Sequence, residues 1–92
     1  MTIINLRTAV VIPTLEGDQA TLPEDVRTVR ELLHYIGSKI NFDIIDSISG
    51  NLHDDFEIAV NGREACFLPG RLDTQLKNND TVEINIVGLG GG

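Results

Sequence analysis

The sequence predicts a single α+β domain in which one helix packs against a mixed sheet of about four strands, in the order ββαββ. Three observations predict it: alternating apolar residues near the start, one amphipathic helical stripe after them, and two further alternating segments toward the end. A chain of 92 residues is the size of one domain and leaves no room for a separate catalytic domain.

The first two strands are expected to form a hairpin. If residues 2–12 are extended, four apolar side chains share one face: Ile4, Leu6, Val10 and Ile12. Pro13 interrupts this strand, and the Glu-Gly-Asp run at residues 16–18 predicts a turn. A second strand is therefore expected over residues 19–22.

The helix is predicted to begin with a capping box. The Thr28 hydroxyl is placed to accept a hydrogen bond from the Glu31 amide, and the Glu31 side chain can reach back. A single apolar stripe at helical spacing follows: Val29, Leu32, Leu33, Ile36 and Ile40. Because Gly37 weakens a helix by about 1 kcal/mol relative to Ala, the helix either ends there or continues to Ile40.

The segment between the helix and the next hairpin, residues 41–55, carries three isoleucines. Ile44, Ile45 and Ile48 fit a short helix that packs on the core and ends at Gly50-Asn51. This second helix is a further expectation of the sequence.

A second hairpin follows. Phe56, Ile58 and Val60 alternate, Asn61-Gly62 predicts a type I′ turn, and residues 63–67 are expected to return as a strand. A two-residue turn pairs Val60 with Arg63. The same register would place Ala65 and Phe67 on that face and Cys66 on the other.

The last strand is the most regular segment. Val82, Ile84 and Ile86 alternate with polar residues, and the preceding Asn-Asn-Asp run is a turn in which Asn79 can be left-handed. The first and last strands both have the pattern of buried strands, so we expect them to lie side by side and parallel at the centre of the sheet.

Composition narrows the functional classes. A net charge of −7 disfavours binding to nucleic acids and anionic membranes and favours a basic protein partner. With Cys66 as the single cysteine, no internal disulfide or four-thiolate metal site can form. The sequence also lacks a secretory signal and the roughly 20 apolar residues of a membrane span, which leads us to expect a cytoplasmic protein.

Two other candidate sites have weaker support. Cys66 with His34 or His53 would make a thiol–imidazole pair, although no other feature of the sequence supports that pairing. The run His53-Asp54-Asp55 could ligate a metal, but three consecutive loop residues more often form a solvated turn. The sequence contains no recognisable catalytic constellation, and we expect no metal site.

Four features make the chain resemble the MoaD/ThiS-type sulfur carriers, a family with the β-grasp (ubiquitin-like) fold. They are the initial hairpin, the run Thr-Val-Arg-Glu-Leu-Leu at 28–33, Val60-Asn61-Gly62, and the run 76–82 that leads to the last strand and a terminal diglycine. The resemblance spans the whole chain and is closest to the small subunit of molybdopterin synthase. The chain departs from the family pattern at two places. Gly88-Leu89-Gly90 precedes the diglycine, where the family often has proline or another small residue, and Asn79 stands where the family often has glycine.

The resemblance implies a function. The carboxylate of Gly92 would be adenylated and converted to a thiocarboxylate that donates sulfur in cofactor biosynthesis, of the molybdopterin type first and the thiamin type second. The implied partners are an E1-like adenylating enzyme of MoeB or ThiF type, which uses ATP, and the large subunit of molybdopterin synthase or an equivalent acceptor. The chain itself would bind no cofactor and would be a carrier or a non-catalytic subunit. An alternative of another class is a ubiquitin-like binding or conjugating module.

The glycine-rich end is the predicted site. We expect a β-grasp domain over residues 1–87 and a flexible tail over residues 88–92. Gly91 and Gly92 have no side chains and can thread a narrow channel, and five extended residues span up to ~17 Å. The residues expected to contact a partner are Gly88, Leu89 and Gly90 in the tail and Phe67 on the exposed side of the sheet.

Overall fold

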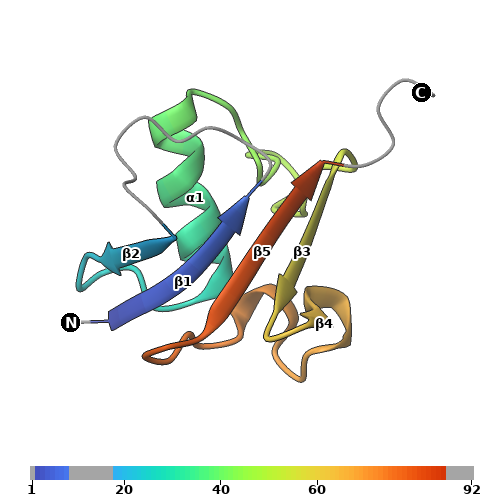
Figure 1. Cartoon of the computed structure of the whole chain (residues 1–92). Coiled ribbons are helices and arrows are strands. Elements are labelled where there is room, and N and C mark those ends of the chain that lie inside the picture. The colour runs from blue at the N-terminus through green and yellow to red at the C-terminus, as the bar shows by residue number, and fades with distance from the viewer. Residues whose placement is uncertain (1, 9–17, 87–92) are drawn as a thin grey trace.

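The computed structural model describes residues 2–8 and 18–86, and in this part of the chain one helix packs on a five-stranded sheet (Figure 1). The elements are β1 (Thr2–Thr8), β2 (Gln19–Leu22), α1 (Val29–Ile40), β3 (Phe56–Val60), β4 (Arg63–Glu64), the 3₁₀ turns η1 (Ala65–Phe67) and η2 (Arg71–Asp73), and β5 (Thr81–Ile86).

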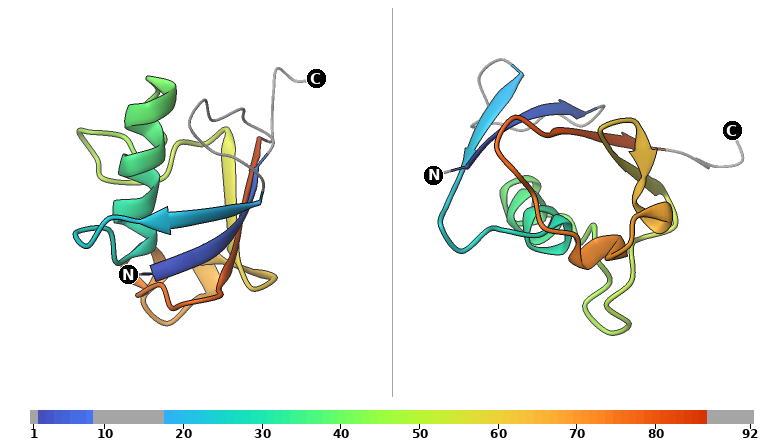
Figure 2. Two further views of the ribbon diagram at one scale, coloured as in Figure 1. Left: turned by 60° about the vertical axis from the view of Figure 1, so that its left-hand side comes forward. Right: turned by 90° about the horizontal axis from the view of Figure 1, so that it is seen from below.

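The strand order is β2-β1-β5-β3-β4. The first and last strands, β1 and β5, are parallel neighbours at the centre of the sheet, as predicted, and the other pairs are antiparallel. Helix α1 lies on one face (Figure 2), and no helix among the described residues covers the opposite face. The predicted β-grasp α+β class is confirmed, with the two-residue β4 as the fifth strand.

The first hairpin agrees with the sequence over the residues that can be compared. β2 occupies the predicted residues 19–22, and β1 is described to Thr8. Ile4 and Leu6 are buried on the face toward α1, while Val10 and Ile12 lie outside the described residues. The helix stripe and the inward residues of the strands supply much of the remaining core: Val29, Leu32, Leu33, Ile36, Phe56, Ile58, Val60, Val82 and Ile84. Leu22, Val26, Ile44, Ile45, Ala65 and Leu76 complete it.

The predicted capping box begins α1. The Glu31 amide donates to the Thr28 hydroxyl at 3.2 Å, and the Thr28 amide donates to the Glu31 carboxylate at 3.0 Å. The helix continues past Gly37 to Ile40 and ends at Asn41, whose φ of 58° is left-handed. Of the two predicted ends, the later one is therefore right.

Gly37 has a packing role at the end of this helix. The Phe42 amide donates to the Gly37 carbonyl at 3.0 Å, which folds the chain back against the helix. A Cβ at residue 37 would lie 2.5 Å from the carbonyl oxygen of Phe42. Only glycine allows this close approach without a shift of the backbone.

The short second helix predicted for residues 41–55 is wrong. Ile44 and Ile45 are buried, but Ile48 is 96% exposed at the tip of a turn. The Asp46 carboxylate accepts hydrogen bonds from the amides of Ile48 at 2.8 Å and Ser49 at 3.3 Å. The Asp46 carboxylate therefore caps a single turn, which ends at the left-handed Gly50 instead of continuing as a helix.

This loop closes as a narrow hairpin. The Asp46 amide donates to the Asn51 carbonyl at 2.8 Å, Gly50 has a φ of 75°, and Ile45 bridges to Leu52. From α1, the Arg30 guanidinium donates to the Gly50 carbonyl and also contacts Asp73 at 3.0 Å. The helix therefore holds both this loop and η2.

The second hairpin has the predicted turn but a shorter return strand. Asn61 and Gly62 have φ values of 54° and 83°, as a type I′ turn requires, and Val60 pairs with Arg63. The return strand stops at Glu64, so the prediction of a strand over residues 63–67 is wrong. Ala65 turns into the core within η1, while Phe67 is 72% exposed, because a 3₁₀ turn has three residues per turn rather than two.

The turn before β5 is confirmed, since Asn79 has a φ of 72°. Its amide donates to the Ile3 carbonyl at 2.7 Å, and the Asn5 amide donates to the Asp80 carbonyl at 2.8 Å. These bonds fix the start of β5 against β1.

Candidate functional site

The tail predicted as the reactive site, with Gly88, Leu89, Gly90, Gly91 and Gly92, lies outside the described residues, as does the predicted domain boundary. The strand that leads to it is well defined. β5 is hydrogen-bonded to β1 on one side and to β3 on the other, and its last register pair is Phe56 with Ile86. The chain therefore leaves the sheet from a fixed position at the end of the central strand.

The sheet face opposite α1 is acidic. The register places Arg7 beside Glu83, Glu83 beside Ala59, and Ala59 beside Glu64, so these four residues form one row across four strands. In the next row, Glu57 lies beside Asn85. We call Glu57, Glu64 and Glu83 the acidic face.

Two carboxyl groups of the acidic face interact directly. A hydrogen bond with the Glu64 side chain, followed by repulsion from its charge, raises the pKa of Glu57 above the ordinary value of 4.5. The Cys66 thiol donates to the same Glu64 carboxylate at 3.7 Å. Cys66 is therefore exposed beside the acidic face, in contact with Glu64 rather than with His34 or His53.

Phe67 is the exposed apolar side chain next to this face. It belongs to η1, directly after the edge strand β4, and its 72% exposure leaves the ring available to a partner. Its role as a partner contact stays a prediction.

An aromatic cluster lies close to the end of β5. The ring of Phe42 is 5.5 Å from Phe56 and 5.3 Å from His53, and the rings of His53 and Phe56 are 6.0 Å apart. Phe56 is the register partner of Ile86, so the cluster is next to the point where the tail begins.

His53 also orders the turn that precedes β3. Its Nδ1 accepts a hydrogen bond from the Asp55 amide at 3.2 Å and lies 3.7 Å from the Asp55 carboxylate. Within residues 2–8 and 18–86 there is no group of three or more His, Cys, Asp and Glu side chains placed to hold a metal ion.

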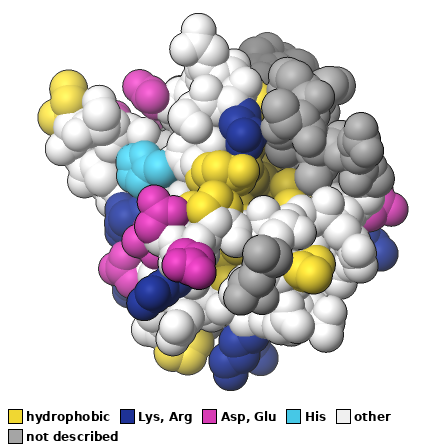
Figure 3. Space-filling view, turned by 90° about the vertical axis from the view of Figure 1, so that its left-hand side faces the viewer, with side chains coloured by type: hydrophobic (Ala, Val, Ile, Leu, Met, Phe, Trp, Pro, Cys, Tyr) yellow, Lys and Arg dark blue, Asp and Glu magenta, His cyan; other side chains and the backbone are white. Residues whose placement is uncertain are grey.

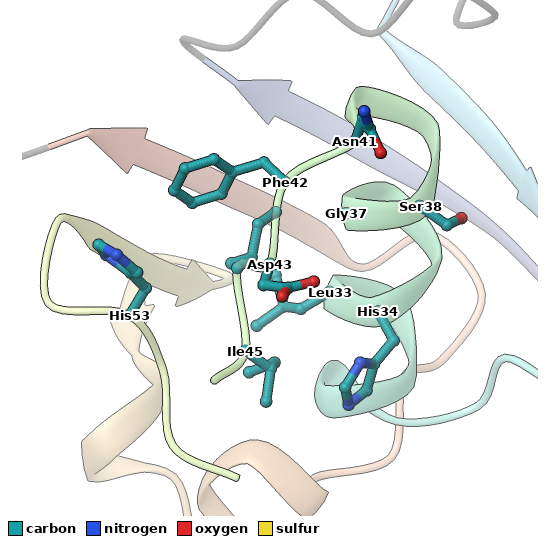
Figure 4. A pocket seen from close by; sticks show the side chains of 10 residues that line it. Leu33, His34, Gly37, Ser38, Asn41, Phe42, Asp43, Ile45 and His53 are labelled. Carbon is teal, nitrogen blue, oxygen red and sulfur yellow. The ribbon is translucent and has the colours of Figure 1, made fainter. Parts of the chain in front are cut away.

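A cavity of about 570 Å³ opens between the second half of α1 and the chain that follows it (Figure 4). Phe42 and His53 lie on one side of it, and His34 and Ser38 project from the helix on the other. The sequence did not predict this cavity. Gly37, a glycine inside a helical stripe, was the one signal that another backbone segment approaches the helix there.

No helix in the described part of the chain is long and apolar enough to cross a membrane.

Comparison with known proteins gives a match to one family and matches to solved structures, among them two from Haloferax volcanii. The ThiS family matches residues 8–91 of the chain. The solution structure of the HVO 2177 protein of Haloferax volcanii has a TM-score of 0.69 and 19% identity, covering 98% of this chain and 87% of that one. The crystal structure of SAMP1 from Haloferax volcanii has a TM-score of 0.62 and 15% identity, covering 97% of this chain and 99% of that one. No curated protein sequence gives a significant match. At these identities the two structures share the fold with this chain.

Proposed function

The chain belongs to the ThiS family, and from that premise we propose that it is a ubiquitin-like sulfur carrier whose reactive group is the carboxylate of Gly92. The observation that carries the proposal is a family match over residues 8–91 on a β-grasp body whose central strand leads into a glycine-rich run. The proposed setting is the cytoplasm, where the single thiol of Cys66 stays reduced.

The proposed chemistry has two steps. A terminal carboxylate, whose ordinary pKa is ~3.3–3.7, is ionised at neutral pH, so an oxygen of Gly92 attacks the α-phosphate of ATP and pyrophosphate leaves. Hydrosulfide then attacks the acyl carbon of the adenylate and AMP leaves, which gives the thiocarboxylate. A persulfide donor would give an acyl disulfide instead, and a second thiol would reduce it to the thiocarboxylate while forming a disulfide with the donor sulfur. ATP and the sulfur donor are brought by partner enzymes, the first of them an E1-like adenylating enzyme of MoeB or ThiF type.

The body of the chain contributes position. The ladders on both sides of β5 hold the start of the tail, and the six residues 87–92 span up to ~20 Å when extended. Glycine backbones can follow a narrow channel that side chains would block. The carboxylate can thus reach a buried active site while the sheet stays outside.

A docking surface is needed besides the tail. Ordering tail residues costs about 1–2 kcal/mol each in conformational entropy, so the tail alone gives little affinity. The acidic face of the sheet carries Glu57, Glu64 and Glu83 against one cation in the same rows, Arg7. On the side of the molecule seen in Figure 3, by contrast, acidic and basic side chains are interspersed. We propose that the acidic face, with Phe67 at its edge, meets a basic surface of the activating enzyme.

Charge reversal tests this docking surface. The variant with Glu57, Glu64 and Glu83 changed to Lys should associate more slowly with the activating enzyme and lose the salt dependence of the association rate. The matched control reverses three exposed acids elsewhere: Glu24, Asp25 and Asp43. Equal association rates for the two triple variants would show that the acidic face does not steer the partner.

Mass spectrometry of the intact protein tests the chemistry. After incubation with the activating enzyme, ATP and a sulfur donor, one oxygen should be replaced by sulfur on the C-terminal fragment. Deleting Gly92 or adding one residue should abolish this, because one residue shifts the carboxylate by ~3.5 Å and a misplacement of about 1 Å can cost 10²-fold. Cys66→Ser should leave transfer intact. Sulfur found on Cys66, or equal modification of the truncated chain, would contradict the proposal.

The acceptor decides the pathway. We propose the molybdopterin type, with the large subunit of molybdopterin synthase as acceptor, because the carriers of thiamin synthesis tend to be shorter than these 92 residues. The thiocarboxylate should then sulfurate a pterin precursor bound to that subunit. Transfer into a thiazole instead would assign the thiamin type, and an amide bond between Gly92 and a lysine of another protein would assign a conjugating module.

A further inference from the structure

A groove of about 340 Å³ lies at the other end of the sheet from the tail. Its walls come from the β3–β4 hairpin, from the chain after η1, and from the segment that leads into β5. The residues that line it are Val60, Asn61, Arg63, Leu68, Thr74, Gln75, Lys77 and Asp80. Val60 pairs with Val82 near the start of β5, whereas the tail follows Ile86 at its end. The groove is therefore separate from the site of the proposed sulfur chemistry.

Two of the chain's seven Lys and Arg side chains meet in this groove. Arg63 comes from the edge strand β4, and Lys77 comes from the turn before β5. Within residues 2–8 and 18–86, the ion pairs are Arg30 with Asp73 and His53 with Asp55, so neither Arg63 nor Lys77 has a carboxylate partner there. The two cations thus lie together in a chain whose net charge is −7.

The one acid in the lining is already bonded to its own turn. One Asp80 oxygen accepts from the Asn61 side-chain amide at 2.9 Å, and the other accepts from the Lys77 backbone amide at 2.8 Å. These bonds hold the carboxylate in the turn and leave the Lys77 ammonium group free. Two cations against one acid give the groove a formal charge of +1.

Neutral donors complete the lining. The Gln75 side chain is exposed and makes no hydrogen bond within the described residues. The Thr74 hydroxyl is buried in the groove wall and also lacks a hydrogen-bond partner among the described residues. A guanidinium fork, an ammonium group and an amide are the donors that bind carboxylate and phosphate oxygens.

We propose that this groove binds a small oxyanion, the carboxylate or phosphate group at the end of a ligand or partner chain. Arg63 and Lys77 supply the charge, and Gln75 supplies a hydrogen bond. Leu68 and Val60 give an apolar wall on which the remainder of the ligand lies. This inference does not rest on the proposed sulfur-carrier function, because the groove lies near the start of β5 and includes no residue of the tail.

The test is a ¹H–¹⁵N titration of the full chain at constant ionic strength, with inorganic phosphate in one series and glycylglycine in the other. The proposal expects saturable shifts confined to the amides of residues 61–63 and 74–80, with millimolar affinity. Saturation by phosphate alone assigns a phosphoryl ligand, and saturation by glycylglycine alone assigns a peptide carboxylate.

Matched variants locate the binding. Arg63→Gln and Lys77→Gln, singly and together, should weaken binding, with the double variant weakened about tenfold or more, which is about 1.4 kcal/mol. The control pair Arg7→Gln and Lys39→Gln removes the same charge at exposed or half-exposed positions outside the groove and should bind as the native chain does. Unchanged resonances of the sheet core verify that each variant is folded. Linear shifts spread over the surface with both probes, or equal binding by the Arg63/Lys77 double variant, would overturn the proposal.

Discussion

Replacing Gly37 by alanine tests how the chain after α1 is held against the helix. From helix propensity alone, alanine should stabilise an interior helical position by about 0.8–1.0 kcal/mol over glycine. The structure predicts the opposite sign. The added Cβ would lie 2.5 Å from the Phe42 carbonyl oxygen, and ordinary contact begins near 3.4 Å, so the backbone at Phe42 must move by about 0.9 Å.

That movement strains two hydrogen bonds. The Phe42 amide donates to the Gly37 carbonyl at 3.0 Å, and the Ile44 amide donates to the Phe42 carbonyl at 3.1 Å. Overpacking of this kind costs about 1–3 kcal/mol, and each weakened bond removes up to about 0.5–1.5 kcal/mol. Set against the propensity gain, the free energy of unfolding should fall by about 1–2 kcal/mol, and Tm should fall by about 4–8 °C per kcal/mol.

The assay is urea denaturation followed by circular dichroism, with Ser38→Ala as the control at the next, exposed position. The control should stay within about 0.5 kcal/mol of the native chain. The Phe42 amide bonds the Gly37 carbonyl and the Phe42 ring contacts His53, so the amide resonances of residues 42 and 53 should shift more in Gly37→Ala than in Ser38→Ala. A Gly37→Ala chain as stable as the native one would refute the close approach of Phe42.

Four further predictions concern the helix start, the acidic face and the loop after α1. Thr28→Ala should lower the free energy of unfolding by about 1 kcal/mol through loss of the capping box, measured in urea. Hydrogen bonds from the Arg27 and Thr28 amides lower the pKa of Glu31. The ionised carboxylate therefore contributes to the free energy of unfolding in full above pH 4.5, and this contribution is lost as the pH falls through the folded pKa. Glu31→Gln should remove that pH dependence. In an NMR titration the pKa of Glu57 should lie above 4.5 and should fall in Glu64→Gln; no change would rule out the shared hydrogen bond. Ile48→Asp should leave stability within about 0.5 kcal/mol, whereas Ile45→Ala should cost about 2–5 kcal/mol; similar losses would contradict the loop.

The parts of the fold that the sequence predicted are those with a local chemical cause. Thr28 and Glu31 form a capping box whose hydrogen bonds do not depend on what the helix packs against. The left-handed angles of Asn61, Gly62 and Asn79 are likewise set by the turns in which these residues lie. The apolar alternation in the first and last strands indicated that both are well buried, and the predicted parallel pairing at the centre of the sheet is what the register shows.

The errors have tertiary causes. Ile44 and Ile45 are adjacent and both buried, as Leu32 and Leu33 are on the helix stripe, so the pattern alone does not distinguish a helix from a loop. The turn capped by Asp46 ends at once, because Gly50 is left-handed. The return strand is cut at Glu64 because Ala65 turns into the core. The path of the chain after the second hairpin is therefore set by the burial of Ala65 and not by the alternation of its side chains.

The candidate sites also differ in whether a local sequence pattern or the tertiary fold creates them. The glycine-rich tail is a local signal and was predicted from the sequence. The groove was not, because Arg63 and Lys77 are far apart in sequence and are brought together only when the β3–β4 hairpin and the turn before β5 meet. The cavity beside Phe42 likewise depends on the fold of residues 41–53.

The two-residue strand β4 keeps the acidic face and the groove apart. Successive residues of a strand point to opposite faces, so Glu64 joins Ala59 and Glu83 on the open face of the sheet, while Arg63, paired with Val60, lies with the groove. A strand of opposite register would place the arginine among the glutamates and cancel part of the negative surface. The tail start at Ile86 and the groove at Val82 are four residues apart along β5, about 14 Å and beyond the screening length of ~8–10 Å in physiological salt. An anion bound in the groove should therefore have little electrostatic effect at the Ile86 end of β5.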